Sequence, residues 1–195
     1  MDNKQIQEQR MRGYFLESAK NLLKGEGLRS ISVRNVAHHA GYSYATLYNY
    51  FKDLNELIFY CVEDFQKEAA EFIGRKTAGV PDGREKIKAI AKAYTEYFIE
   101  YPGVFELFFL ERMGDIGSRE QTADLIYTFL DRLCEGQWEL AVKEGAVTAD
   151  QAAALKSRLR FAVMGMLLFY ENRMHPATYP EFIAQMENQI DGILA

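Results

Sequence analysis

Apolar residues recur every three or four positions along most of the chain, and this helical period is the feature that most limits its fold. Between Asn3 and Lys24 they fall on one helical face, as Ile6, Met11, Phe15, Leu16, Ala19, Leu22 and Leu23. No stretch shows the alternating pattern of strands joined by hairpin turns, and no internal repeat is visible. The sequence therefore predicts an all-α protein.

Glycine, proline and capping residues divide this pattern into separate helices. Gly25 and Gly27 end the first helix, and Ser32, Ser43 and Asp53 stand where the N-caps of the next three belong. The stretch AGVPDG at 78–83 is the strongest linker signal. The predicted helices after the first cover 33–40, 44–51, 54–74, 84–100, 104–113, 120–143, 149–174 and 179–194.

Composition fits a soluble protein with a substantial core. The chain has 195 residues, of which 48% are hydrophobic, and no apolar run reaches the length of a membrane span. Its first residues are polar and do not resemble a signal peptide, and the two cysteines, Cys61 and Cys134, lie far apart with no disulfide pattern. We therefore expect a cytoplasmic protein with no membrane partner.

The net charge of −5 is unevenly distributed. Residues 1–60 contain eight Lys or Arg and six Asp or Glu, which gives +2, so the rest of the chain carries −7. A mildly basic head on an acidic body lets one end approach phosphate groups while the remainder keeps the chain in solution.

Two short predicted helices joined by a turn at Gly41, with the first helix packed against them, describe a helix-turn-helix. At about 100° per residue, Leu47 and Phe51 share the inner face of 44–51. The opposite face and its flanks then carry Ala45, Thr46 and Asn49, with Tyr44, Tyr48 and Tyr50 beside them.

This outward face suits a recognition helix in the major groove of DNA. Small residues allow close approach, a Thr or Ala methyl can contact a thymine methyl, and Asn49 can bond a base edge. Tyrosine hydroxyls can donate to phosphate oxygens, and Ser43 adds a hydroxyl at the start of the helix. The alternative is a surface helix whose tyrosines serve another interface.

The spacing of these residues resembles the TetR family of bacterial transcriptional repressors over about residues 10–57. The matching positions include Arg12, Phe15, Leu16, Ala19, Leu22, Leu23, Gly27, Ser32, Val33, Arg34, Val36, Ala37, Ala40, Gly41, Ser43, Thr46, Leu47, Tyr48, Tyr50 and Phe51. The resemblance implies a homodimer with a helix-turn-helix DNA-binding domain at 1–52 and a regulatory, effector-binding and dimerisation domain at 53–195. It implies DNA contacts by Arg34, Tyr44, Ala45, Thr46, Tyr48, Asn49, Tyr50 and Lys52, with Ser43 beside them. Leu54 stands where the family has a phosphate-contacting lysine, and Lys52 is the expected substitute.

The second half of the chain is rich in aromatic and sulfur-containing side chains, which suit an apolar, adaptable effector pocket. For any one of these positions alone, a place in the hydrophobic core is favoured over the wall of a pocket. The candidate ligand-binding residues are Phe98, Phe105, Phe109, Met113, Tyr127, Trp138, Phe161 and Met164.

The last two predicted helices resemble a dimer surface. Residues 159–170 are apolar nearly all round, Gly165 permits close helix approach, and 182, 186 and 190 form a stripe on the final helix. The alternative is an internal core helix. The predicted interface comprises Leu159, Val163, Gly165, Met166, Phe182, Met186 and Ile190.

No spacing of residues indicates an enzyme, a metal site or a cofactor. His38 and His39 lack further ligands at suitable spacing, and no nucleotide-binding or catalytic motif is present. The predicted function is a DNA-binding transcriptional regulator, a repressor released from a palindromic double-stranded operator by a small apolar or aromatic effector. The alternative is an all-α protein-interaction or ligand-binding module whose head has lost DNA affinity.

Overall fold

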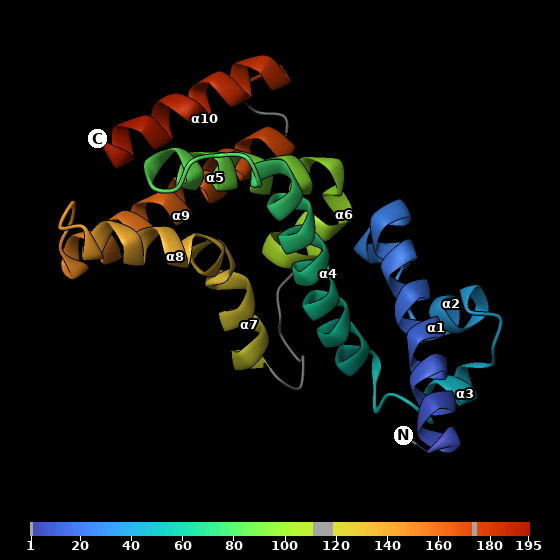
Figure 1. Ribbon diagram of the computed structural model, residues 1–195. Helices are drawn as coiled ribbons and strands as arrows, with labels where there is room; N and C mark the ends of the chain where they lie inside the picture. The colour runs from blue at the N-terminus through green and yellow to red at the C-terminus, as the bar shows by residue number, and fades with distance from the viewer. Residues whose placement is uncertain (1, 111–118, 173–174) are drawn as a thin grey trace. The chain divides into compact units, whose positions relative to one another are not determined.

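The computed structural model describes residues 2–110, 119–172 and 175–195, and these residues form helices and connecting turns with no strand among them. The helices are α1 (Asn3–Glu26), α2 (Val33–His39), α3 (Tyr44–Leu47), α4 (Leu54–Thr77), α5 (Arg84–Glu100), α6 (Pro102–Phe105), α7 (Arg119–Tyr127), α8 (Phe129–Lys143), α9 (Ala149–Glu171) and α10 (Tyr179–Leu194). A 3-10 turn η1 (Leu28–Ser30) follows α1, and a π-helical turn η2 (Glu106–Leu110) follows α6. The prediction of an all-α fold is confirmed (Figure 1).

The chain packs as two compact units, and each is built from separate segments. Unit 1 comprises residues 1–67 and 101–127, and unit 2 comprises 68–100 and 128–195. The first part of α4 therefore belongs to unit 1 and its end to unit 2. This division by packing differs from the predicted division by function at residues 52 and 53, which stays a prediction.

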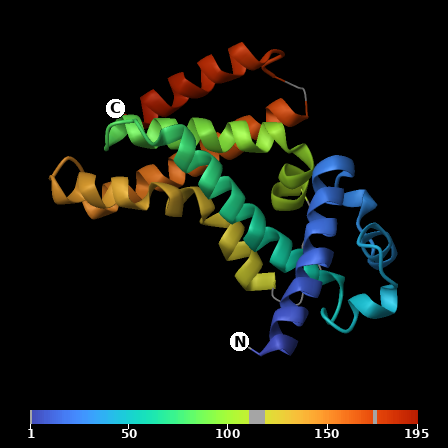
Figure 2. The ribbon, with the colours of Figure 1, turned by 45° about the vertical axis from the view of Figure 1, so that its right-hand side comes forward.

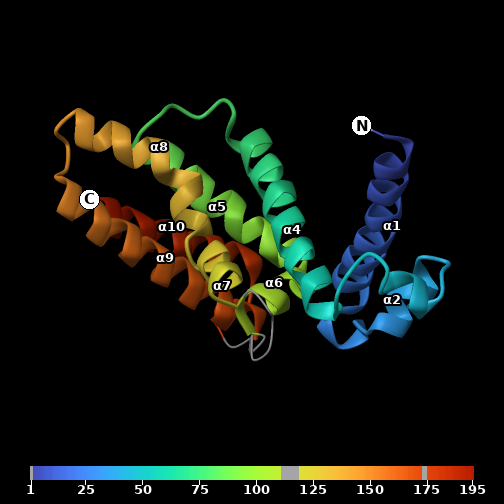
Figure 3. The same cartoon turned by 90° about the horizontal axis from the view of Figure 1, so that it is seen from below.

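In unit 1, the central helix is α1, which contacts α2, η1 and α6 (Figure 3). Its buried face carries Phe15, Ala19, Leu22 and Leu23. The helix continues through Gly25 to Glu26, and of the two predicted end residues Gly27 is confirmed as the C-cap, with φ 76° and its N–H donating to the Leu23 carbonyl at 3.2 Å. A side chain other than glycine would be strained in this conformation.

A contact between main-chain atoms joins α6 to the end of α1. A Cβ placed on Gly103 would lie 1.9 Å from the Leu23 oxygen and 3.1 Å from Gly27 Cα. Gly103, Val104 and Phe105 are all buried, and Pro102 occupies the first turn of α6, where its missing N–H removes no helical bond. The two helices can approach this closely only because residue 103 has no side chain.

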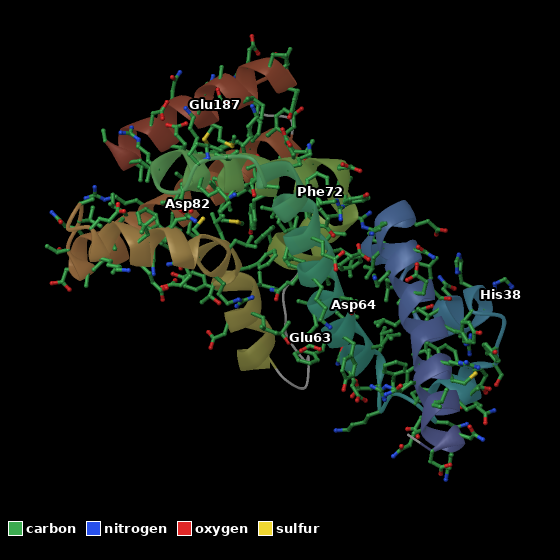
Figure 4. The ribbon with its side chains drawn as sticks, viewed as in Figure 1. His38, Glu63, Asp64, Phe72, Asp82 and Glu187 are labelled. Atoms are coloured by element: carbon green, nitrogen blue, oxygen red, sulfur yellow. The ribbon has the colours of Figure 1, made fainter. Side chains whose placement is uncertain are left out.

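An ion pair below the surface joins α1 to the first half of α4. Lys20 Nζ lies 3.3 Å from Asp64 Oδ2, and the Lys20 side chain is only 8% exposed. Its ammonium also lies 5.7 Å from the centre of the Phe65 ring. Figure 4 shows Asp64 on the part of α4 that belongs to unit 1. The pair fixes the two helices in register as well as neutralising a buried charge.

Unit 2 is a bundle in which α5, α8, α9 and α10 run side by side (Figure 2). Its core includes Tyr94 and Phe98 from α5, whose ring centroids lie 4.8 Å apart. Ion pairs from Lys88 to Asp191 at 2.9 Å and from Lys92 to Glu187 at 3.0 Å hold α5 to α10 along their exposed edges, where Glu187 is marked in Figure 4.

Two predicted helices are each replaced by two elements in the structure. The predicted helix 120–143 is divided at Thr128, whose φ of −93° and ψ of 3° end α7 before α8 begins. The apolar positions Ile126, Phe129 and Leu130 are buried on both sides of the break, so periodicity gives no sign of it. The predicted helix 104–113 is replaced by α6 and η2 up to Leu110, and its last residues lie outside the described ones.

In the described part of the chain, no helix combines the length and the apolar character that crossing a membrane requires.

Replacing Gly103 with alanine tests the contact between α1 and α6. Because the new Cβ would overlap the Leu23 carbonyl, we expect Gly103→Ala to lower the free energy of unfolding by about 3 kcal/mol, an overpacking cost. Gly13→Ala, in the middle of the same helix α1 with no atom near its Cβ, should raise it by up to about 1 kcal/mol. Urea unfolding of both variants measures the difference, and equal midpoints would contradict the close approach.

Candidate functional site

The turn between α2 and α3 is fixed by three residues that the sequence predicts. The Ser32 hydroxyl caps α2 by accepting from the Asn35 N–H at 3.1 Å, and the Ser43 hydroxyl caps α3 by accepting from the Thr46 N–H at 3.2 Å. Between them, Gly41 has φ 78°, a conformation that other residues rarely adopt. The predicted caps and the glycine turn of a helix-turn-helix are confirmed.

The predicted recognition helix 44–51 is shorter than expected. Regular α-helix covers only α3, and Asn49 and Tyr50 then donate to carbonyls three residues back, at 3.1 and 2.9 Å. Phe51 returns to the helical pattern with a bond to Leu47 at 3.0 Å. The tighter turn shifts the side chains after Leu47 from the positions that regular helical spacing gives them. The sequence pattern, which assumes that regular spacing, does not predict the shift.

Leu47 and Phe51 anchor this segment, as predicted. Leu47 is 0% exposed and Phe51 is 2% exposed. The Phe51 ring meets Phe15 of α1 edge-on at a centroid distance of 6.5 Å. Burial of two large apolar side chains from one short segment supplies the stability that so short a helix lacks alone.

Arg12 of α1 also holds the end of the segment 44–51 in place, through contacts with Phe51 and Tyr50. Its guanidinium lies 4.5 Å from the ring centre of Phe51 and 4.8 Å from that of Tyr60, and it donates to the Tyr50 carbonyl. Glu56 lies 3.9 Å away as an ionic partner. Arg12 therefore contributes to the candidate interface by fixing the orientation of the segment 44–51.

The predicted contact residues of this segment point mostly to solvent. Tyr44 is 58% exposed and Tyr48 51%, and Ala45 and Asn49 are exposed between them. The Tyr50 ring packs on Phe15 at 6.0 Å and is half-buried, which leaves it less available. The Thr46 and Ser43 hydroxyls lie 2.9 Å apart and bond each other, so both already have a partner.

The predicted basic contacts flank the segment. Arg34 on α2 and Lys52 after Phe51 are both exposed. Leu54, at the position of the family lysine, is half-buried at the first residue of α4 and offers no charge. Asp53 caps that helix as predicted, accepting from the Glu56 N–H at 2.9 Å.

One aromatic pair beside the candidate interface is not predicted by the sequence. Tyr14 of α1 and Tyr42 of the turn stack with centroids 6.4 Å apart, and they remain 54% and 39% exposed. Tyr14 stands on the polar side of α1, where no periodicity marks it. Two stacked tyrosines in solvent usually indicate an interface.

The predicted ligand-binding residues do not gather in one unit. Phe98, Trp138, Phe161 and Met164 belong to unit 2, and Phe105, Phe109 and Tyr127 belong to unit 1. Phe98, Phe105 and Trp138 are buried and Phe109 and Met164 half-buried, whereas Tyr127 and Phe161 are 50% and 60% exposed. Met113 lies outside the described residues. As a set, they stay a prediction.

Most of the predicted dimer residues are buried within a single chain. Leu159, Val163, Phe182, Met186 and Ile190 are each at most 2% exposed, and only Gly165 and Met166 are half-buried. Their burial has a physical reason, because α10 lays its apolar stripe on α9 and α5. These five side chains belong to the core of unit 2, and the surface of a single chain does not present them.

The opposite face of α9 is apolar as well. Phe161, Leu168 and Phe169 are 60%, 41% and 53% exposed, and Gly165 lies between them at helical spacing. The two faces explain why this helix reads as apolar nearly all round.

In the part of the chain that the structure describes, no three or more His, Cys, Asp or Glu side chains gather in a way that could hold a metal ion. Burial raises the pKa of both thiols, Cys61 and Cys134, to about 12. Burial also raises the pKa of Asp131, against the opposing effect of its ion-pair partner Arg160. His38 and His39 are exposed at the end of α2, and His38 is marked in Figure 4.

Comparison with known proteins agrees with this geometry. Residues 15–61 match the family model of bacterial regulatory proteins, tetR family. A TetR family transcription regulator from Marinobacter aquaeolei VT8 has a TM-score of 0.65 at 18% identity, with 98% of each chain covered. The transcriptional regulator FadR from Bacillus subtilis, in complex with stearoyl-CoA, has a TM-score of 0.72 at 11% identity, with 93% of this chain and 97% of that chain covered. At these identities the structural likeness shows the fold.

The raised thiol pKa values predict slow thiol chemistry in the native protein. At pH 8 a pKa of about 12, against an ordinary 9.0, lowers the thiolate fraction about a thousandfold. We therefore expect Ellman's reagent to react with neither Cys61 nor Cys134 until the chain is unfolded in guanidinium. Ala153→Cys, an exposed position on α9, should add one fast thiol. Rapid reaction of the unaltered protein would contradict the burial.

Proposed function

We infer that this chain is a regulator of the TetR family and binds DNA in a sequence-specific way to regulate transcription, and its N-terminal family match and its fold support this. The observation that carries the proposal is the segment Tyr44–Asn49, which presents Tyr44, Ala45, Tyr48 and Asn49 to solvent while Leu47 is fully buried beneath it. The proposal assigns no catalytic activity, and it places the protein in the cytoplasm with the DNA it reads.

The exposed residues divide by chemistry into two roles. Asn49 has an amide that can bond both edge groups of an adenine, and Ala45 can meet a thymine methyl. Tyr44 and Tyr48 carry hydroxyls on the flank, and Arg34 and Lys52 carry charge, so these four suit phosphate. Lys52 takes over the charge that Leu54 lacks.

A homodimer would place two such segments in successive major grooves, roughly 34 Å apart, and so read a near-palindromic operator. We assign the dimer surface to the outer face of α9, with Phe161, Leu168 and Phe169 around Gly165. Three large apolar side chains exposed together are costly in water and suit burial against a second copy.

The regulatory role we propose is repression relieved by a small apolar or aromatic effector. Support comes from the aromatic content of unit 2 and from the like-folded FadR, whose structure holds stearoyl-CoA. An effector acts by binding one conformation of the protein better than another, and by linkage DNA and effector then weaken each other's binding equally.

Selection from a random duplex pool tests the DNA-binding proposal. We expect enrichment of a near-palindrome by the unaltered protein. Asn49→Ala should relax preference at one base pair in each half-site, by about 1–3 kcal/mol, whereas Tyr48→Phe should weaken binding to all sequences alike. Asn188→Ala, an exposed asparagine on α10, is the matched control and should change neither.

If no sequence is enriched even at low salt, the proposal fails. The alternative then gains support, namely a protein-interaction or ligand-binding module whose head has no affinity for DNA. Steep loss of binding with added salt would speak for phosphate contacts and against that alternative.

Sedimentation equilibrium tests the dimer surface. Phe169→Glu places a charge in the proposed interface, and we expect it to raise the dimer dissociation constant at least about a hundredfold, on the order of 3 kcal/mol. Val142→Glu, at a 37% exposed apolar position on α8, adds the same charge elsewhere and should leave dimerisation intact. Equal behaviour of the two variants would move the interface away from this face of α9.

A further inference from the structure

A cavity of about 650 Å³ that is open to solvent lies at one end of the helical bundle of unit 2. Its walls come from the first turn of α5, the end of α8, the start of α9 and the last turn of α10. This is the end where the turn between α8 and α9 and the C mark lie in Figure 1. The volume falls within the range of pockets that hold small organic molecules.

The inner wall of the cavity is apolar. Ile87 and Trp138 are buried at its base, and Leu155 and Ile193 are half-buried along its sides. Two residues of the lining, Ala141 and Ala154, have small side chains, and larger ones at these positions would reduce the space. An apolar hollow that the chain's own side chains leave open favours an apolar occupant.

Hydrogen bonds hold the mouth of the cavity in place. Gln137 accepts from the Gly83 N–H at 2.6 Å and donates to Asp82 at 3.0 Å, which ties the turn before α5 to α8. Figure 4 marks Asp82 at this turn. On the opposite side, Thr148 and Gln151 form a capping box that fixes the start of α9. The site is preformed, so a ligand need not order these turns.

The polar groups at the rim favour an acidic ligand. Arg158 is exposed there, and no hydrogen bond or ion pair to it is recorded among the described residues. Arg84 shares the rim but already donates to the Asp191 carbonyl at 2.8 Å. Glu144 is the one carboxylate side chain in the lining, and Arg84 is already paired with Asp191, so Arg158 is the cation in the lining that a ligand can pair with.

One buried polar group in the lining has no hydrogen-bond partner in the part of the chain that is described. Within the described residues, the indole N–H of Trp138 has no hydrogen-bond partner, although the ring is only 3% exposed. Buried polar groups are normally satisfied. A carboxylate at the rim would pair with Arg158.

We propose that this cavity binds a small monocarboxylate with an apolar body. The apolar body occupies the space between Ile87, Trp138 and Leu155, and the carboxylate lies toward Arg158. The inference concerns unit 2 and holds whether or not the protein binds DNA.

A second hollow, of about 370 Å³, shares the Trp138 ring but suits such a ligand less well. Its walls carry Glu135, Glu139, Lys143 and Lys156, and Lys156 already pairs with Glu135 at 2.8 Å. The two hollows are distinguished by Ala154, which lines only the larger one.

The chain has a single tryptophan, so its fluorescence reports on the Trp138 wall that the two hollows share, and Ala154 tells the two hollows apart. We would titrate the full-length protein with decanoate and, separately, with uncharged decan-1-ol. A saturable change in emission with one site per chain is expected for both. Arg158→Gln should weaken decanoate binding about tenfold and leave decanol binding within about twofold. Arg75→Gln, an exposed arginine on α4 outside the lining, is the matched control and should change neither.

Ala154→Phe should abolish binding of both probes by filling the cavity. Because Ala154 is exposed on α9, the larger side chain is not forced into the core, and circular dichroism melting checks that the variant folds. Absence of saturable binding, or unaltered binding by folded Ala154→Phe, would overturn the site. Equal effects of Arg158→Gln and Arg75→Gln on decanoate would overturn the role of the carboxylate.

Discussion

The packing of Leu47 and Phe51 against α1 is the interaction on which the proposed DNA-binding surface depends. The helix α3 spans only four residues, too few to persist through its own hydrogen bonds. Its orientation is imposed from beneath by Phe15 and from the side by Arg12, which stacks on Phe51 and bonds the Tyr50 carbonyl. Because Leu47 and Phe51 fix the inner face of the segment, Tyr44, Tyr48 and Asn49 are exposed to solvent.

The helix α9 shows why burial and interface are hard to separate in a sequence. Leu159 and Val163 on one face and Phe161 and Phe169 on the other are residues of the same kind at the same spacing. Which face the subunit covers depends on where α10 and α5 lie, and these contacts span many residues along the chain. The sequence therefore predicts that α9 is apolar on nearly all sides. It does not predict which face is buried within the chain and which is exposed.

Local signals explain which features could be predicted. The caps Ser32 and Ser43 and the turn at Gly41 act within three or four residues, so the helix-turn-helix and its outward residues followed from the sequence. The break at Thr128 and the division of the aromatic residues between two units depend on packing far along the chain. The same holds for the cavity beside Trp138. It is a space that the side chains leave unfilled, and no sequence pattern marks such a space.

The close approach of Gly103 to the Leu23 carbonyl has a mechanical consequence. Both partners are main-chain atoms, so the contact contains no rotatable side chain that could absorb a displacement. Because the two helices are already in contact, α6 cannot move toward α1 without displacing the last turn of α1. The residues of the helix-turn-helix that pack on α1 would be displaced with it. A contact between main-chain atoms therefore passes a displacement of one helix to the other. Substitutions of the neighbouring side chains would leave this contact in place.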